Sequence, residues 1–182
     1  LDKGTGYILG SHNTENILNM IPNVSISHLR AGFMYYNLFG FISMIKQAGF
    51  IASNYGNDDK IVMVAPSDIA AEAAKELIDP TIGNKICYVA SDDRTANEVA
   101  EVLGKAINEP RLQWKILSIE EMRRKLEQKS VPKHAIENII ALNESIHNGN
   151  MRKDYDRVKA KPTGKIKIED FAQVFASVYH KS

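Results

Sequence analysis

Strand-like runs alternate with helical segments along most of this chain, and that alternation limits the possible folds more than any other feature. Val24–Arg30 alternates apolar and polar side chains, as a strand with one buried face does. Met34–Ala48 then carries apolar residues at helical spacing, and Lys85–Ala90 is a continuous apolar run, typical of a strand buried in a parallel sheet. Because strands and helices alternate and the second half is mainly helical, we predict an α/β fold with a helical lobe.

Capping residues mark where several helices begin. Thr95–Glu98 and Ser118–Glu121 each place a hydroxyl and a glutamate three residues apart, which is the pattern of a capping box. Ser67 and Asp68 form an N-cap pair ahead of an alanine-rich helix that Asp79–Pro80 should end. Apolar spacing predicts further helices over 11–21, from 132 toward 149 and over 168–179.

Turn-forming residues suggest how some strands connect. Ile51–Tyr55 and Ile61–Val64 are short strand-like runs separated by Gly56–Asp59, and a hairpin is one interpretation. The acid pairs at 58–59 and 92–93 are interpreted as turn residues.

The charge balance argues against a nucleic-acid partner. The 182 residues include 23 Lys+Arg and 22 Asp+Glu, which gives a formal net charge of +1. Binding to phosphates needs a basic surplus on one face, and this chain has none. The lysines and arginines between 153 and 167 are interspersed with Asp154 and Asp156, and we interpret this stretch as a solvated linker.

Other residue patterns bear on cellular location, on the cysteine and on metal binding. No apolar run approaches the roughly 18 residues of a membrane span, and the first residues lack a secretory hydrophobic region, so we expect a cytoplasmic protein with no membrane partner. The single Cys87 lies in an apolar run and is interpreted as a core residue. The histidines are scattered, so no metal site is expected; they are His12, His28, His134, His147 and His180.

Two features near the start invite a ligand. Gly4–Gly10 is glycine-rich, and we interpret it as a loop because no strand precedes it. The alternative is a phosphate loop, in which case Arg30 at the end of the next strand would suit a 2′-phosphate. His12 lies beside Ser11 and Asn13 where a helix is expected to begin, so a ligand could meet exposed amides there.

Ser27–Phe39 combines a strand, a sharp turn and an aromatic-rich helix, and this is the most specific stretch of the chain. It resembles the Leu-Arg-Pro-Gly-Phe-Phe-x-x-Asn-Leu segment of the NmrA-like family, atypical short-chain dehydrogenases with an NAD(P)-binding Rossmann fold. Pro66–Ala70 is similar to the family's Asp-Ile-Ala helix start. Residues 12–18 and 85–104 are similar to further family segments in the same order.

The resemblance covers only the second half of the family. It implies that residues 1–182 form a single-domain fragment, the C-terminal half of a Rossmann-like fold whose N-terminal Gly-rich half is absent from these residues. In that interpretation, 1–92 is the remainder of the sheet and its helices, and 93–182 is a helical, substrate-side lobe. The expected partners are the missing N-terminal half and a second copy of the chain, because uncovered strands expose their edges.

The resemblance also implies a site for NAD or NADP and a small-molecule substrate. The backbone at Ala31, Gly32 and Phe33 would approach the nicotinamide, and His12 is a further candidate for cofactor binding. Tyr35, Tyr36 and Asn37 would line the substrate pocket, with core packing as the alternative for the tyrosines. Ala31 stands where the family often has proline.

Catalysis is left open. A reductase of this kind would use a Tyr-x-x-x-Lys pair, but Tyr7 has Ser11 at that spacing, so no catalytic residue is assigned. The resemblance therefore implies either the substrate side of an NAD(P)-dependent oxidoreductase or a non-catalytic NAD(P) sensor. The isolated chain is expected to be inactive and to bind the cofactor weakly or not at all.

Overall fold

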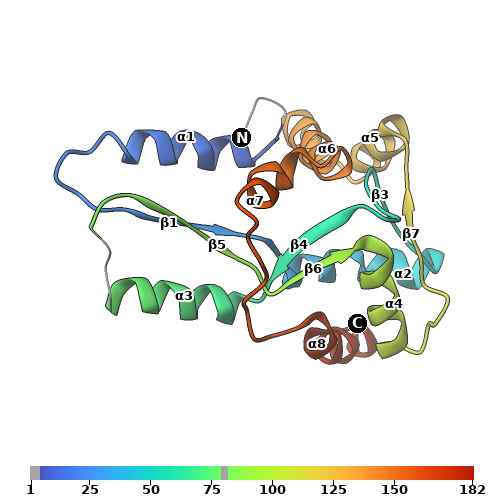
Figure 1. Cartoon of the computed structure of the whole chain (residues 1–182). Helices are drawn as coiled ribbons and strands as arrows, with labels where there is room; N and C mark the ends of the chain where they lie inside the picture. The colour runs from blue at the N-terminus through green and yellow to red at the C-terminus, as the bar shows by residue number, and fades with distance from the viewer. Residues whose placement is uncertain (1–4, 79–81) are drawn as a thin grey trace.

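A pair of parallel strands lies between two helices in one half of the molecule (Figure 1). The computed structural model describes residues 5–78 and 82–182. Strand β1 (Ser27–Ala31) pairs in parallel with β5 (Lys85–Val89), with Ser27 opposite Lys85 and Ala31 opposite Val89. Helix α1 (Ile8–Leu18) lies over one face of this pair and α3 (Pro66–Ile78) over the other.

Within residues 5–78 and 82–182, five further strands build the other half. Strands β2 (Phe33–Met34), β4 (Lys60–Val64) and β6 (Asp92–Thr95) form a sheet in the order β2-β4-β6, parallel between β2 and β4 and antiparallel between β4 and β6. Strand β3 (Ile51–Ser53) pairs in parallel with β7 (Trp114–Ile116).

Helices surround these strands. The 3₁₀ helix η1 (Tyr35–Phe41), α2 (Ile42–Ala48), α4 (Ala96–Ala106) and α8 (Ile168–Lys181) lie on one side, and α5 (Ile119–Gln128) and α6 (Lys133–His147) lie on the other (Figure 1). A short connection, η2 (Asn150–Arg152) and α7 (Lys153–Arg157), follows α6. The core between the helices is aromatic and aliphatic, and its fully buried members include Trp114, Tyr35, Phe175 and Leu38.

Both predicted capping boxes are confirmed. Thr95 Oγ1 accepts from the Glu98 amide at 3.2 Å, and the Glu98 carboxylate accepts from the Thr95 amide at 2.7 Å. The Ser118–Glu121 pair makes the same two bonds at 3.2 and 2.9 Å. Such caps are local, because each satisfies amides within its own first helical turn.

The predicted hairpin is wrong. The turn at Gly56–Asp59 forms, but the strands before and after it do not pair with each other. Strand β3 pairs with β7, and β4 pairs with β2 and β6. The Asn57 amide donates to the Trp114 carbonyl at 3.1 Å, and an added Cβ on Gly56 would lie 2.8 Å from the Trp114 indole. Packing against Trp114 therefore directs β3 away from β4.

Several element boundaries also differ from the prediction. The helix expected over 34–48 is a short strand and a 3₁₀ helix before α2 begins, because the buried Tyr35 is bonded to Asp92. The acid pair at 92–93 belongs to strand β6 and not to a turn. Helix α3 begins at Pro66, so Asp68 lies inside its first turn; the expected stop at 79–80 lies outside the described residues.

Burial corrects three interpretations. Strand β5 is not buried on both faces, since Ile86 is 47% exposed. It belongs to a two-stranded sheet with β1. Cys87 is half-buried and so is not a full core residue. The stretch 153–167 is not a plain solvated linker, because it contains α7, whose Tyr155 is buried. Across residues 5–78 and 82–182, no helix is both long enough and apolar enough to cross a membrane.

Candidate functional site

The carboxyl end of β1 leads through Gly32 into β2, and this junction needs a residue without a side chain. An added Cβ on Gly32 would lie 2.6 Å from the Val62 carbonyl oxygen in β4. The Gly32 amide donates to the Val89 carbonyl at the end of β5, 3.0 Å away. Ala31 is exposed, and Phe33 is half-buried. In open α/β sheets ligands bind outside the carboxyl ends of the strands, so this junction lies where a cofactor is expected.

A buried carboxylate, Asp92, lies at the start of β6. It accepts hydrogen bonds from the Tyr35 hydroxyl and from the Ile168 amide at the start of α8, each at 2.7 Å. Burial, together with the hydrogen bond to Asp92, raises the pKa of the Tyr35 phenol. Tyr35 therefore holds its proton against Asp92 and is a poor proton donor for a substrate.

Asp68 is a second buried carboxylate, in the first turn of α3. Its oxygens accept from the Ser91 hydroxyl at 2.7 Å and from the amides of Lys165 and Ile166 at 3.0 and 3.1 Å. Burial opposes ionisation of Asp68, but these hydrogen bonds outweigh it and lower its pKa. The ionised carboxylate thus fastens the segment before α8 to the rest of the fold.

Gly164 completes this attachment, which we call the Asp68 clamp (Asp68, Ser91 and residues 164–167). The Gly164 amide donates to the Ala90 carbonyl at 2.8 Å. The Lys167 ammonium donates to the carbonyls of Ser91 and Gly164 at 2.6 and 2.9 Å. The backbone of the clamp passes so close to Asp68 that a side chain at 164 has no room.

A hollow of about 280 Å³ opens beside the clamp, between η1, the start of α3 and α8. Its walls are mainly apolar and aromatic, with Tyr36, Phe171 and Val174 among them, and Tyr35 lies beneath. Tyr36 is 56% exposed, and its ring centroid lies 5.9 Å from that of Phe171. We call this the tyrosine hollow. Asp170, the one charged side chain among the described residues that line it, already accepts from the Lys167 amide at 2.9 Å. The hollow suits a small, flat, apolar ring system.

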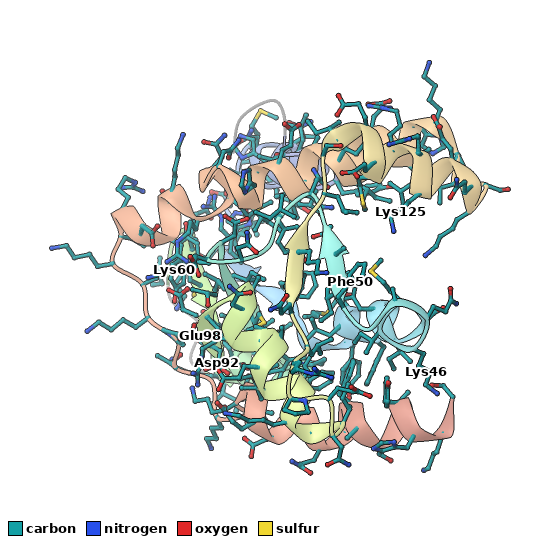
Figure 2. The ribbon with its side chains drawn as sticks, turned by 90° about the vertical axis from the view of Figure 1, so that its right-hand side faces the viewer. Lys46, Phe50, Lys60, Asp92, Glu98 and Lys125 are labelled. Atoms are coloured by element: carbon teal, nitrogen blue, oxygen red, sulfur yellow. The ribbon has the colours of Figure 1, made fainter. Side chains whose placement is uncertain are left out.

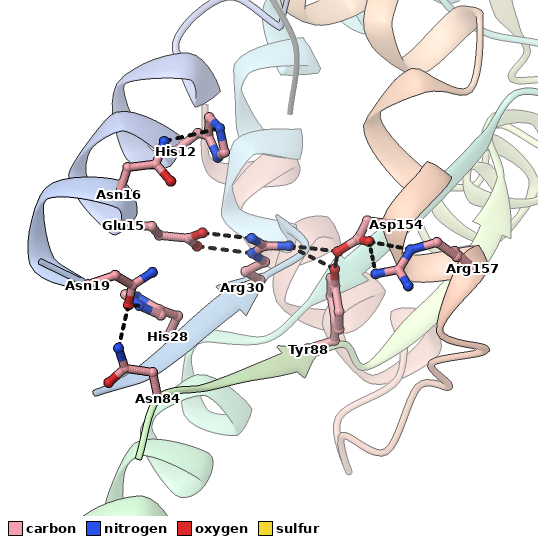
Figure 3. A network of polar contacts seen from close by, with 10 residues as sticks. All are labelled: His12, Glu15, Asn16, Asn19, His28, Arg30, Asn84, Tyr88, Asp154 and Arg157. Carbon is pink, nitrogen blue, oxygen red and sulfur yellow. Dashed lines mark hydrogen bonds and ion pairs between the residues drawn. The ribbon is translucent and has the colours of Figure 1, made fainter. Parts of the chain in front are cut away.

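Arg30, at the carboxyl end of β1, is the centre of a polar network (Figure 3). Its guanidinium donates to both Glu15 oxygens at 3.0 and 2.7 Å, to Asp154 at 2.8 Å and to the Tyr88 hydroxyl at 2.9 Å. Asp154 also accepts from the Tyr88 hydroxyl and from Arg157. The network ties α1 and α7 to β1 and β5. Because most donors of Arg30 are in use, a 2′-phosphate would have to displace these carboxylates to bind it.

The fork geometry of Arg30 predicts a large cost for Arg30→Lys. Lysine keeps the charge but cannot contact Glu15, Asp154 and Tyr88 together, so we expect the free energy of unfolding in urea to fall by about 2 kcal/mol. Arg123→Lys is the matched control, since the Arg123–Glu137 pair joins α5 to α6 at the surface and should change the free energy of unfolding very little. Equal small effects at both positions would contradict the role of the network.

The Gly-rich start does not fit a phosphate loop. Helix α1 begins at Ile8, so Gly10 is helical, and Gly4 lies outside the described residues. Gly6 packs on α6, where an added Cβ would lie 2.2 Å from the Asn138 carbonyl oxygen. This glycine therefore serves helix packing.

His12 lies in the second turn of α1 and not at exposed starting amides. Its Nε2 is 3.3 Å from the Asn16 amide nitrogen (Figure 3), and its buried Nδ1 has no hydrogen-bond partner within the described part of the chain. The structure brings Tyr35 and Tyr36 to the tyrosine hollow, whereas Asn37 is exposed and does not line it. The binding roles of Ala31, Gly32, Phe33 and His12 stay predictions.

One group of side chains has the spacing of metal ligands. Donor atoms of Glu72, Glu76 and Cys87 lie within 4.8 Å of one another. Glu76 is already bonded to the Lys85 ammonium and the Ser27 hydroxyl, each at 2.7 Å. The Lys85 ammonium already neutralises the negative charge of Glu76, so this group of side chains does not need a metal cation to balance its charge.

Sequence reasoning missed the Asp68 clamp and the role of Asp92. The sequence pattern predicts only local roles for both residues: Asp68 as part of a helix N-cap and Asp92 as a turn residue. The sequence held a signal for Asp92, because it lies two residues after the apolar run Lys85–Ala90, where a buried strand is expected to end. A charged residue in that place needs a partner, since an unpaired buried carboxylate is costly.

Solved structures share this arrangement. An NADPH-dependent quinone oxidoreductase from Escherichia coli matches with a TM-score of 0.74 and 18% identity, over 95% of this chain and 61% of that chain. A triphenylmethane reductase from Citrobacter sp., complexed with NADP(H), matches with a TM-score of 0.68 and 19% identity, over 92% and 57%. A nucleoside-diphosphate-sugar epimerase from Staphylococcus aureus matches with a TM-score of 0.68 and 14% identity, over 95% and 61%.

No protein-family model matches the sequence, and no curated protein matches it. The structural matches confirm the predicted fold class: the chain is α/β and follows the Rossmann-like arrangement of NAD(P)-dependent reductases and an epimerase. The chain spans about 61% of the length of the quinone oxidoreductase and of the epimerase.

Proposed function

We propose that this chain is the substrate side of an NAD(P)-dependent oxidoreductase that acts on a small, flat aromatic or quinone-like molecule. The observation that carries the proposal is the tyrosine hollow, whose aromatic wall at Tyr36 and Phe171 lies next to the carboxyl edge of the strands. Structural neighbours include a quinone oxidoreductase and a triphenylmethane reductase, both of which act on ring systems by their names.

The residues at the junction fit the nicotinamide end of the cofactor. Ala31 is exposed at the carboxyl end of β1, and Gly32 next to it lies close to β4 and β5. When bound, a reduced nicotinamide would supply the hydride. A segment corresponding to the rest of the neighbours' chains would hold the pyrophosphate, because Gly6 is turned into α6 packing.

The chain's own residues would position the substrate. Tyr36 and Phe171 would stack on its ring within the mainly apolar hollow. Asp92 keeps the Tyr35 phenol in place beneath the hollow. Since that phenol is held by Asp92, we assign it to positioning and assign no proton donor.

Binding of menadione, a small flat quinone, tests the proposal. We expect saturable binding to the 182-residue chain by NMR titration, and Tyr36→Ala should weaken it roughly tenfold because an exposed stacking ring is lost. Tyr7→Ala is the control, since Tyr7 is equally exposed but lies outside the hollow. Binding that is absent, or that Tyr7→Ala weakens as much as Tyr36→Ala, would refute the assignment.

The commitment of Tyr35 to Asp92 also favours a second candidate, a non-catalytic NAD(P) sensor. NADPH oxidation with menadione separates the oxidoreductase from the sensor. It is measured with this chain joined to a segment that corresponds to the rest of the neighbours' chains. Turnover supports the oxidoreductase, and binding of both ligands without turnover supports the sensor.

A further inference from the structure

A second hollow, of about 500 Å³, lies between the start of α4 and β7 and shares no residue with the tyrosine hollow. Its volume is within the range of roughly 300–1,000 Å³ that is usual for ligand sites. Figure 2 faces this side of the molecule, with Glu98 labelled on α4 and Phe50 near β7. We call it the α4–β7 groove.

The polar side chains of the groove are unused. Asn57, Asn97, Arg111 and Gln113 line it, and within the described residues none of these side chains makes a hydrogen bond or an ion pair. This differs from Arg30, whose guanidinium is bonded to several side chains. Amide and guanidinium groups that converge on one hollow without partners are available to a polar ligand.

The lining is positively charged. Arg111 and Lys115 contribute cations, and none of the described residues that line the groove is a carboxylate, although Asp58 and Glu109 are close to it in sequence. The Lys115 ammonium lies 4.3 Å from the Phe50 ring centroid, a contact that holds the charge without neutralising it. A ligand for this groove should therefore carry negative charge.

The backbone under the groove is held by hydrogen bonds between separate segments. The Asn57 amide donates to the Trp114 carbonyl at 3.1 Å, and the Asn97 amide donates to the Asn57 carbonyl at 2.8 Å. Trp114 itself is fully buried, and Gly56 packs directly on its indole. The unused side chains thus project from a fixed frame, which lowers the entropy cost of binding.

We propose that the α4–β7 groove binds a phosphorylated sugar. Arg111 and Lys115 would hold the phosphate, because a guanidinium matches phosphate oxygens in pairs. The amides of Asn57, Asn97 and Gln113 would bind the sugar hydroxyls, for which a primary amide offers both donors and an acceptor. This site is separate from the proposed oxidoreductase site, and neither depends on the other.

Calorimetric titration of the 182-residue chain with ribose phosphate tests the site. We expect saturable binding that the double variant Arg111→Gln/Lys115→Gln weakens at least roughly tenfold. Arg124→Gln, at an exposed arginine of α5 outside the groove, should leave binding unchanged. Melting temperatures should match the wild type in all variants, because the substituted side chains are exposed.

Inorganic phosphate and ribose, titrated separately, test the two halves of the proposal. We expect weaker binding of phosphate than of ribose phosphate, and weaker binding still of ribose. Absence of saturable ribose phosphate binding would overturn the site, as would binding that the double variant leaves intact. Phosphate that binds as tightly as ribose phosphate would overturn the sugar contacts.

Discussion

Gly164→Ala should unfold far more easily than the wild-type chain, with a free energy of unfolding lower by about 3 kcal/mol. An alanine Cβ at this position would lie 2.4 Å from an Asp68 carboxylate oxygen and 2.6 Å from the Ser91 hydroxyl oxygen. Both groups are buried and bonded to each other, so neither can move aside without losing its partner. The variant therefore loses stability in two ways: the added methyl group overpacks the site, and hydrogen bonds to the charged Asp68 are broken.

Urea denaturation of the purified variants measures this effect. Gly10→Ala is the control, because Gly10 lies inside α1 and, apart from its own helix backbone, no heavy atom of the described residues lies within 4 Å of an added Cβ. Alanine there should stabilise the chain by up to about 1 kcal/mol, as it favours the helix. If Gly164→Ala and Gly10→Ala changed stability alike, the Asp68 clamp would not have the packing described.

The elements that the sequence could predict are those fixed by neighbours in the chain. The boxes at Thr95 and Ser118 close within one helical turn, and their helices begin where the pattern indicates. Strand pairing depends on distant residues, and the hairpin between Ile51–Tyr55 and Ile61–Val64 was the prediction that failed. The run at Ile51–Ser53 is equally compatible with β4 or β7, and the packing of Gly56 on Trp114 decides between them.

Part of the tyrosine hollow could also be predicted, because some of its residues are neighbours in the chain. The strand, turn and aromatic helix around Gly32 are contiguous, so the two tyrosines could be placed in the right region. That Tyr35 points down to Asp92 while Tyr36 faces the hollow depends on a 3₁₀ turn and on a carboxylate 57 residues away. The Asp68 clamp joins segments 97 residues apart, and no local pattern indicates it.

The surface around the β1–β5 pair predicts the second large effect, self-association. Within the described residues each of these strands pairs only with the other, so both outer edges are open. Large apolar side chains are exposed on β5 and on or just after the two helices that cover the pair: Met20 is 74% exposed and Leu77 is 83% exposed, and Ile17, Ile78 and Ile86 are exposed as well. Covering several hundred Å² of such surface, at about 25 cal/mol per Å², is worth on the order of 10 kcal/mol.

We therefore expect the chain to form a symmetric dimer through this surface at micromolar concentration, since a twofold pair buries the same patch from both copies. Light scattering after size exclusion should give roughly twice the 20.3 kDa of one chain. Met20→Lys/Leu77→Lys should restore the monomer, because desolvating a lysine in the interface opposes the apolar gain. Val158→Lys, at an exposed position of the connection after α7, should remain dimeric. A wild-type monomer whose β1 and β5 amides are protected from exchange would show that the open edges tolerate water and that no second copy is needed to cover them.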